Sequence, residues 1–164
     1  MKDLIKKFLF LNLFALIGFV FFAGCRQQKL DDNKLKEIAA QYTAAWCSQN
    51  AASVASFFAE NGSLKINNGD PSAGREAITK AAQGFMTAFP DMIVEMDSLS
   101  IKAENVIYHW TLIGTNTGPG GTGKSVRISG YEEWTIDEDG LIAESKGHFD
   151  EAEYQHQLEY GLGN

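Results

Sequence analysis

The stretch from Val126 to Phe149 reads VRISGYEEWTIDEDGLIAESKGHF. Over its first half, apolar residues alternate with polar ones, which is the period of a β-strand that buries one face. Asp139-Gly140 then favours a tight hairpin turn, and Leu141–Phe149 continues as a second strand. This stretch therefore predicts an antiparallel hairpin of two long strands.

The same alternation extends upstream of the hairpin. It occurs over Met92–Ile101, with an irregularity near Asp97-Ser98, and very regularly over Val106–Leu112. A glycine-rich loop over Gly114–Gly123 separates these strands from the hairpin. Long strands that follow one another in this way predict an antiparallel sheet.

Before Met92 the apolar residues recur with the period of a helix. Asp31 to Asn33 can cap the first helix, Asn50 can cap the second, and Asn61-Gly62 is expected to end the second. The predicted elements are helices over 34–48, 51–58 and 74–89, a short strand over 63–67 and a terminal helix over 151–160. Together they predict an α+β domain in which helices pack on one face of a curved sheet.

The N-terminus has the order of an export signal. Three lysines precede an apolar run, Phe8–Phe22, that holds six of the eleven phenylalanines. The tetrapeptide that ends at Cys25, Phe-Ala-Gly-Cys, resembles the lipobox of bacterial lipoproteins, in which the cysteine receives a lipid. We therefore expect a signal peptide over 1–24, a lipidated Cys25 with a tether over 25–33, and a folded domain over 34–164. The alternative is an uncleaved membrane anchor.

Charge and cysteine content exclude two features, a nucleic-acid partner and an internal disulfide. The chain has 164 residues with a net charge of −7, and removing residues 1–24 leaves 11 basic and 20 acidic residues, hence a net charge of −9. A surface for nucleic acid must be basic, so we expect no nucleic-acid partner. With Cys25 lipidated, Cys47 has no disulfide partner in the chain and is expected to be a buried apolar residue.

One motif is expected not to bind a ligand. Gly118 to Ser125 satisfies the G-x-x-x-x-G-K-[ST] pattern of a phosphate-binding loop. That loop needs a helix N-terminus directly after it, whereas strand-like residues follow here. The stretch is therefore expected to be a hairpin loop. The spacing of His, Cys and carboxylates suggests no metal site, and we expect no cofactor.

Several short motifs together carry a family resemblance. They are, in order, Gly74–Ile78 (GREAI), Phe89–Asp91 (FPD), His109-Trp110, Gly114–Gly118 (GTNTG), Thr122–Lys124 (TGK) and Asp139–Ile142 (DGLI). Over residues 34–160 the chain resembles the SnoaL-like polyketide cyclases, which lie within the larger group of cone-shaped folds similar to nuclear transport factor 2. The resemblance implies a strongly curved sheet wrapped around helices, with an apolar internal pocket.

The resemblance also implies candidate catalytic residues. The cyclases use an aspartate as acid and base in an aldol closure, and Asp150 matches that position. A carboxyl group in an apolar pocket has a raised pKa and can exchange a proton with carbon. The alternative is that Asp150, with Glu153, caps the terminal helix. His109 and His148 are further catalytic candidates if their strand faces line the pocket, and surface residues otherwise.

The expected ligand contacts are one polar and five aromatic residues. Asn116 stands where the family often has a histidine, so proton transfer at this position is in doubt. The aromatic candidates, for which core packing is the alternative, are Tyr42, Trp46, Phe89, Trp110 and Trp134. We expect a membrane-tethered domain on the outer side of a bacterial membrane that binds a small, largely apolar molecule, with or without acid/base catalysis. A non-catalytic envelope binding module is the alternative, and the resemblance also implies a homodimer through the outer sheet face.

Overall fold

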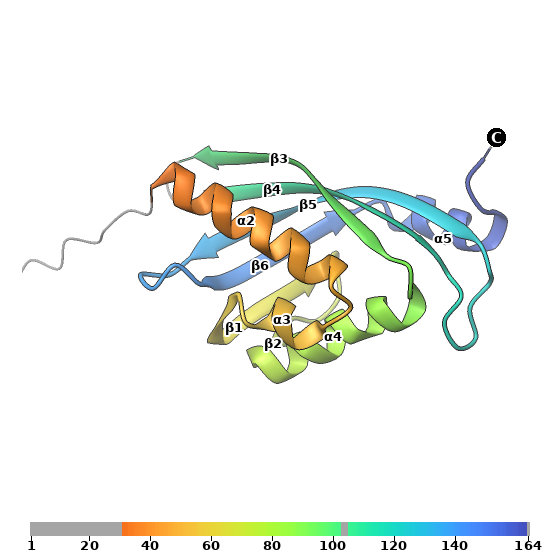
Figure 1. The fold of residues 1–164 in the computed structure, drawn as a ribbon, viewed down its shortest axis with the longest axis horizontal. Helices are drawn as coiled ribbons and strands as arrows, with labels where there is room; N and C mark the ends of the chain where they lie inside the picture. Colours follow the sequence, from red (N-terminus) through yellow and green to blue (C-terminus); the bar gives the residue numbers. More distant parts are fainter. Residues whose placement is uncertain (1–30, 103–104, 164) are drawn as a thin grey trace, which may run out of the picture.

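The computed structural model describes residues 31–102 and 105–163 (Figure 1). Cys25, the expected signal peptide and most of the expected tether lie outside the described residues. Within those two ranges, no helix has both the length and the apolar character that crossing a membrane requires.

Helices precede and follow a mixed sheet. The elements are α2 (Asp32–Cys47), α3 (Ala51–Ala55), β1 (Phe58–Ile66), β2 (Ser72–Ala73), α4 (Gly74–Ala88), β3 (Ile93–Lys102), β4 (Asn105–Thr115), β5 (Ser125–Ile136), β6 (Ile142–Phe149) and α5 (Glu151–Tyr160). The strand order in the sheet is β2-β1-β6-β5-β4-β3. The α+β class and the curved sheet expected from the sequence are confirmed.

One pairing in the sheet is parallel, which the alternation pattern did not indicate. β1 and β6 run in the same direction, whereas every other pair of neighbouring strands is antiparallel. After β1 the chain passes through β2 and α4 to the far edge of the sheet and returns strand by strand. β6 therefore reaches β1 with the same direction as β1.

The helix ends follow the capping signals for the most part. Asp31 accepts a hydrogen bond from the backbone N–H of Asn33 at the start of α2, and Gly161 ends α5 with a φ of 85°. The expectation that Asn61-Gly62 ends a helix is wrong, because both residues lie within β1. A Cβ at Gly62 would lie 2.8 Å from the carbonyl oxygen of Ile142, so a glycine is needed where β1 approaches β6.

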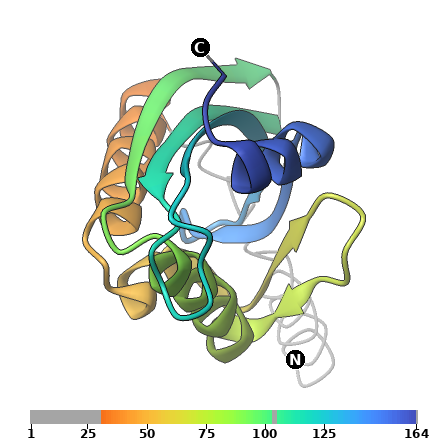
Figure 2. The same ribbon diagram turned by 90° about the vertical axis from the view of Figure 1, so that its right-hand side faces the viewer.

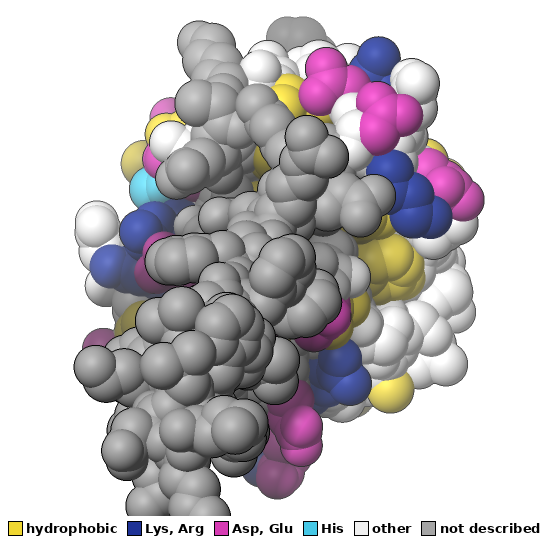
Figure 3. All heavy atoms as spheres, turned by 90° about the vertical axis from the view of Figure 1, so that its left-hand side faces the viewer, with side chains coloured by type: hydrophobic (Ala, Val, Ile, Leu, Met, Phe, Trp, Pro, Cys, Tyr) yellow, Lys and Arg dark blue, Asp and Glu magenta, His cyan; other side chains and the backbone are white. Residues whose placement is uncertain are grey.

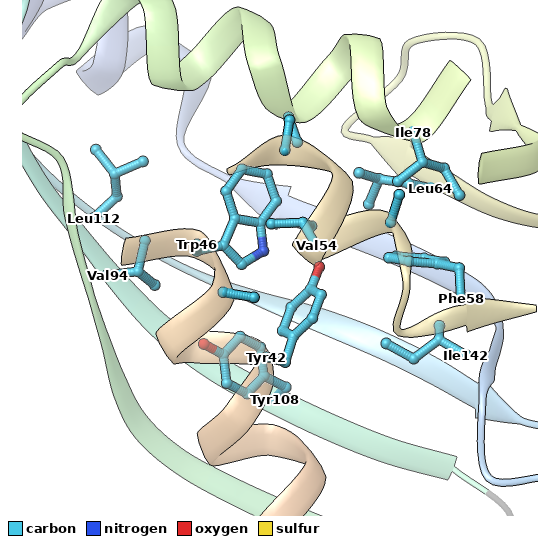
Figure 4. Close-up of a cluster of buried hydrophobic side chains, with 14 of the residues drawn as sticks. Tyr42, Trp46, Val54, Phe58, Leu64, Ile78, Val94, Tyr108, Leu112 and Ile142 are labelled. Carbon is cyan, nitrogen blue, oxygen red and sulfur yellow. The ribbon is translucent and has the colours of Figure 1, made fainter. Parts of the chain in front are cut away.

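The sheet curls around an aromatic core (Figure 2). Tyr42 of α2 is fully buried, and its ring packs against five other aromatic rings. Figure 4 shows this ring between Trp46 and Phe58. Helices α2 and α4 thus supply side chains to the same core as the inner faces of β4 and β5, and this core is the concave side of the sheet.

The outer surface carries mixed charge. On the uncovered part of the face in Figure 3, acidic side chains lie among lysines and arginines. Elsewhere in the described chain, exposed ion pairs join Lys34 to Glu37 and Arg127 to Glu95. Exposed pairs of this kind add little to stability.

Candidate active site: a carboxyl group in an aromatic cavity

A cavity of about 60 Å³ lies on the concave side of the sheet and is partly open to solvent. Its walls come from α2, α4 and five strands, and they are almost entirely apolar. The lining residues are Trp46, Leu64, Ile66, Phe85, Val94, Tyr108, Trp110, Leu112, Glu132, Gly147 and Phe149. The single carboxyl group among them belongs to Glu132.

Strand alternation explains why these residues face inward. Tyr108 and Trp110 lie two residues apart on β4, and Glu132 lies on the same face of β5 as Trp134. Glu132 pairs with Gly147 across the β5–β6 ladder. Successive side chains of a strand point to opposite faces, so every second residue of each strand reaches the cavity side.

Glu132 is held by three hydrogen-bond donors. Its Oε2 accepts from Ser145 Oγ at 2.6 Å, from Trp134 Nε1 at 2.8 Å and from the Tyr42 hydroxyl at 3.1 Å. Its Oε1 receives only a longer contact from the same tyrosine, at 3.4 Å. Because Oε2 is saturated, Oε1 is the atom that can exchange a proton or contact a ligand.

Burial raises the pKa of the Glu132 carboxyl, and the hydrogen bonds from Ser145, Trp134 and Tyr42 oppose this rise. Burial also raises the pKa of Tyr42 well above its ordinary value, and the neighbouring Glu132 adds to that effect. Desolvation penalises the charged form of each group. Tyr42 therefore stays a neutral donor, and Glu132 holds its proton to a higher pH than an exposed glutamate does.

Two glycines make room on this face of the sheet. A Cβ at Gly147 would lie 3.7 Å from Cγ of Glu132, so the absence of a side chain leaves space beside the carboxyl group. A Cβ at Gly130 would lie 2.6 Å from the Trp110 ring and 2.5 Å from the His148 carbonyl oxygen. Gly130 therefore leaves the space that the Trp110 ring occupies next to β5.

The exposure of the lining residues shows which side of the cavity is open. Tyr108, Leu64 and Glu132 are buried, whereas Ile66, Phe85, Trp110 and Phe149 are only partly buried. The buried set forms the floor and the partly buried set forms the mouth. Trp110 Nε1 is also buried and has no hydrogen-bond partner among the described residues, which leaves one donor unsatisfied beside the cavity.

Asp150 lies outside the cavity. It is exposed, and its Oδ1 accepts a hydrogen bond from the backbone N–H of Glu153 at 3.0 Å. This is the helix-capping arrangement that the sequence offered as the alternative to catalysis. A carboxylate at the N-terminus of α5 is stabilised by the free N–H groups of the first turn.

The two histidine candidates lie on the opposite face of the sheet from the cavity. His109, Tyr131 and His148 pair across β4, β5 and β6 and form a row on the outer face. The rings of Tyr131 and His148 are stacked, with centroids 4.8 Å apart. Nε2 of His148 lies 3.5 Å from Oε1 of Glu133. The structure does not bring these histidines to Glu132.

The expected ligand contacts separate into three groups. Trp46 and Trp110 line the cavity, whereas Tyr42 and Trp134 lie behind it and donate to Glu132. The third group lies elsewhere. It consists of Phe89, which is buried in the core, and Asn116.

Asn116 organises a loop. Its side chain donates to the carbonyl of Ala88 and accepts from the N–H of Thr122 at 2.8 Å, which holds the 116–124 loop against the end of α4. β5 follows this loop directly, so the stretch lacks the helix that a phosphate-binding loop needs, as predicted.

Glu132 was not among the candidate residues predicted from the sequence. It lies in a run of acidic residues, which is typical of a solvated face. A signal was present, since Val126, Ile128, Gly130, Glu132 and Trp134 occupy alternate positions of one strand. A carboxyl group in an otherwise apolar series is a candidate buried acid. The described residues contain no group of three His, Cys, Asp or Glu side chains that could hold a metal ion.

Comparison with known protein families identifies the chain. The family model described as SnoaL-like polyketide cyclase matches residues 36–158. The chain belongs to this family. A search of the curated proteins finds no significant match.

Solved structures of similar fold extend this result. A hypothetical protein with a ketosteroid isomerase-like fold from Catenulispora acidiphila, in complex with trimethylamine, has a TM-score of 0.67 at 16% identity, and the match covers 74% of this chain and 92% of that protein. SalBIII, an epoxide hydrolase/cyclase-like enzyme in pyran ring formation in salinomycin, has a TM-score of 0.65 at 22% identity, covering 75% and 95%. A putative SnoaL-like polyketide cyclase from Jannaschia sp. CCS1 has a TM-score of 0.65 at 15% identity. That match covers 82% of this chain and 100% of the Jannaschia protein. At these identities the likeness establishes the fold alone.

Proposed function

We propose that this SnoaL-like domain binds a small, largely apolar molecule in its cavity and that Glu132 is the acid and base toward that molecule. The observation that carries the proposal is the single carboxyl group in an otherwise apolar lining. A buried carboxyl with a raised pKa keeps its proton to a higher pH than an exposed glutamate does, and it can both give and take that proton.

The geometry favours Glu132 over Asp150 for this role. Oε1 of Glu132 has spare capacity, whereas Asp150 is exposed and engaged with the N–H of Glu153. The free indole N–H of Trp110 supports a ligand that carries a hydrogen-bond acceptor such as a carbonyl oxygen. The reaction class is then proton transfer next to a carbonyl, as in an isomerase or an aldol cyclase.

Hydrogen exchange at carbon tests this proposal. Cyclopentanone in D₂O is incubated with the full-length chain, and loss of its α-proton signals is followed by NMR. We expect exchange above the buffer rate, a fall of about 10²–10⁴-fold in Glu132→Gln, and no change in Asp150→Asn. Loss of hydrogen exchange in Asp150→Asn, with exchange retained in Glu132→Gln, would indicate that Asp150 is the acid and base instead.

Binding is measured separately from catalysis. Trp46, Trp110 and Trp134 are the only tryptophans in the chain, and each lies at the cavity or against Glu132, so intrinsic fluorescence reports occupancy. A fluorescence change on adding cyclopentanone without hydrogen exchange would support the second candidate, a non-catalytic binding module. The hydrogen bonds from Tyr42 and Ser145 favour that candidate, because they give Glu132 a structural role as well.

Location and assembly are separate parts of the proposal. We propose export and lipid attachment at Cys25, on the strength of the leader and the lipobox-like tetrapeptide. Incorporation of radiolabelled palmitate into the chain, and its loss in Cys25→Ser, test the attachment.

We also propose a homodimer through the outer face that carries Tyr131. A monomeric mass by light scattering at micromolar concentration would contradict it.

A further inference from the structure

Aromatic rings dominate the cavity wall. Five of the eleven lining residues are aromatic, and they come from α2, α4, β4 and β6. Two pairs meet edge to face: Trp46 with Phe85, and Trp110 with Phe149, each with ring centroids 6.2 Å apart. The faces of aromatic rings carry partial negative charge and attract cations, most strongly where water is excluded.

The carboxyl group in this wall has no positive partner. Among the side chains that the structure describes, no Lys, Arg or His lies within ion-pair distance of Glu132. All the groups that hydrogen-bond to Glu132 are neutral, namely Tyr42, Trp134 and Ser145. A buried carboxylate normally pairs with a cation, and here the open oxygen, Oε1, is left for one.

The size of the cavity limits the ligand. A water molecule occupies about 10–15 Å³ on this measure, so a cavity of about 60 Å³ accepts about four to six groups of that size. A trimethylammonium group has four heavy atoms. It fits within these limits, and the partly open side leaves a path for a short tail.

We propose that the cavity selects molecules that carry a small methylated ammonium group, held between the aromatic rings and the Glu132 carboxylate. The inference rests on the proposed ligand-binding function and specifies its ligand class. The cation supplies the missing charge partner of Glu132, and the rings replace its hydration shell. Phe85 and Trp110 at the mouth would contact it together with Trp46.

Binding of this cation is coupled to proton release. Burial raises the pKa of Glu132, so part of the free protein holds a proton there that the cation must displace. The titratable groups around Glu132 are Tyr42 from α2 and Tyr108 from β4, and burial raises the pKa of both, so they remain neutral. Affinity for the cation therefore rises with pH, whereas affinity for a neutral analogue does not.

An isosteric pair of probes tests the inference on the full-length chain. Choline and 3,3-dimethylbutan-1-ol share their shape and hydroxyl group and differ in a quaternary nitrogen against a quaternary carbon. Both are titrated at pH 8 and followed by tryptophan fluorescence. We expect choline to bind at least tenfold more tightly, and this preference to shrink as the pH is lowered through the pKa of Glu132.

Two variants separate the charge from the rings. Glu132→Gln should bring the two affinities within about twofold of each other, because choline loses its charge partner and dimethylbutanol has none to lose. Phe85→Leu, at a half-buried position, keeps an apolar side chain and should weaken choline binding about three- to tenfold more than it weakens dimethylbutanol binding. The second variant keeps the test open if the first does not fold.

Each outcome decides between the proposals. Equal or tighter binding of dimethylbutanol at pH 8 would overturn the ammonium inference and leave the proposed function intact. Loss of both affinities in Phe85→Leu to the same extent would also count against it, because a loss of apolar contact alone predicts that result. If neither probe, nor cyclopentanone, changes the fluorescence, the proposed binding function itself fails.

Discussion

Glu132 and Glu133 are neighbours in the sequence and lie on opposite faces of the same sheet. Glu132 is buried among three donors on the concave face, whereas the side chain of Glu133 is 46% exposed and lies beside His148 on the outer face. Adjacent residues of β5 thus have different surroundings, because one side chain faces the apolar cavity and the next faces solvent. The difference shows that the environment of a carboxyl group in this fold follows the face of the sheet and not the residue type.

The inner face is the one on which substitution should cost most. Tyr42→Ala removes a fully buried ring and the hydroxyl that donates to Glu132, so we expect the free energy of unfolding to fall by about 3–5 kcal/mol. Tyr42→Phe removes the hydroxyl alone and should cost about 1–3 kcal/mol. Urea unfolding measures both. Equal losses in the two variants would mean that ring packing contributes little.

A side chain at Gly147 should close the cavity. The Cβ position lies 3.7 Å from Glu132 Cγ, so Gly147→Val places methyl groups beside the carboxyl. We expect at least a tenfold loss of dimethylbutanol affinity by fluorescence titration. Gly84→Ala is the control, because nothing lies within 4 Å of its Cβ position. An unchanged affinity in Gly147→Val would place the ligand elsewhere.

The pH dependence of stability should distinguish the two glutamates. Because the pKa of Glu132 is raised in the folded state, its stabilising proton is fully present below the ordinary value of 4.5 and is lost as the pH rises through the folded-state pKa. Relative to Glu132→Gln, the wild type should lose about 1.4 kcal/mol for each unit of that shift.

Urea unfolding from pH 4 to pH 9 measures this effect. Glu133→Gln is the matched control, because it removes a carboxyl group from the exposed outer face of the same strand. Parallel profiles for wild type and Glu132→Gln would show that Glu132 titrates like an exposed residue.

Removing the cap of α5 should have a smaller effect. Asp150→Ala loses the hydrogen bond from Glu153 N–H, and we expect a cost of about 0.5–2 kcal/mol. The amide oxygen of Asn can accept the same hydrogen bond, so Asp150→Asn should lose only the favourable interaction of a negative charge with the helix dipole and keep most of the stability. Thermal unfolding checks both variants. A tenfold change in ligand affinity in either would link Asp150 to the cavity after all.

The smallest effect is expected on the outer face. His148→Ala removes a half-exposed ring whose contact with Glu133 is 3.5 Å long, and the free energy of unfolding should change by no more than about 0.5 kcal/mol. Ligand affinity and cyclopentanone exchange should stay at wild-type values. A large loss of cyclopentanone hydrogen exchange in His148→Ala would contradict the proposal that only the concave face of the sheet takes part.

The fold could be predicted from the sequence further than the site. Regular alternation over Val106–Leu112 located a strand, and the irregularity near Asp97-Ser98 is the register shift between β3 and β4. The parallel pairing of β1 with β6 was not predictable, because it joins strands far apart in the chain and leaves no local pattern.

The site was harder because a strand pattern separates two faces without saying which one is covered. His109 and Trp110 were assigned to opposite faces, but only the placement of α2 and α4 decides that the cavity lies on the side of Trp110. Trp46 was among the aromatic ligand candidates because the resembled fold leaves some aromatic residues on a cavity wall. Glu132 was missed because a carboxylate in an acidic run was interpreted as solvent-exposed. Its position among the alternating apolar residues of β5 was not considered.

The parallel pair β1–β6 has a consequence for how the domain reaches its native state. Asn67 at the end of β1 accepts a hydrogen bond from the N–H of Phe149, so the second half of the chain must be present before β1 gains its partner. Contacts between such distant segments slow folding, because a long loop must close first. Leu64 and Ile66 wall the cavity from β1, and Phe149 walls it from β6. The cavity therefore forms only when the two ends of the domain meet, and a nascent chain that stops short of β6 has none.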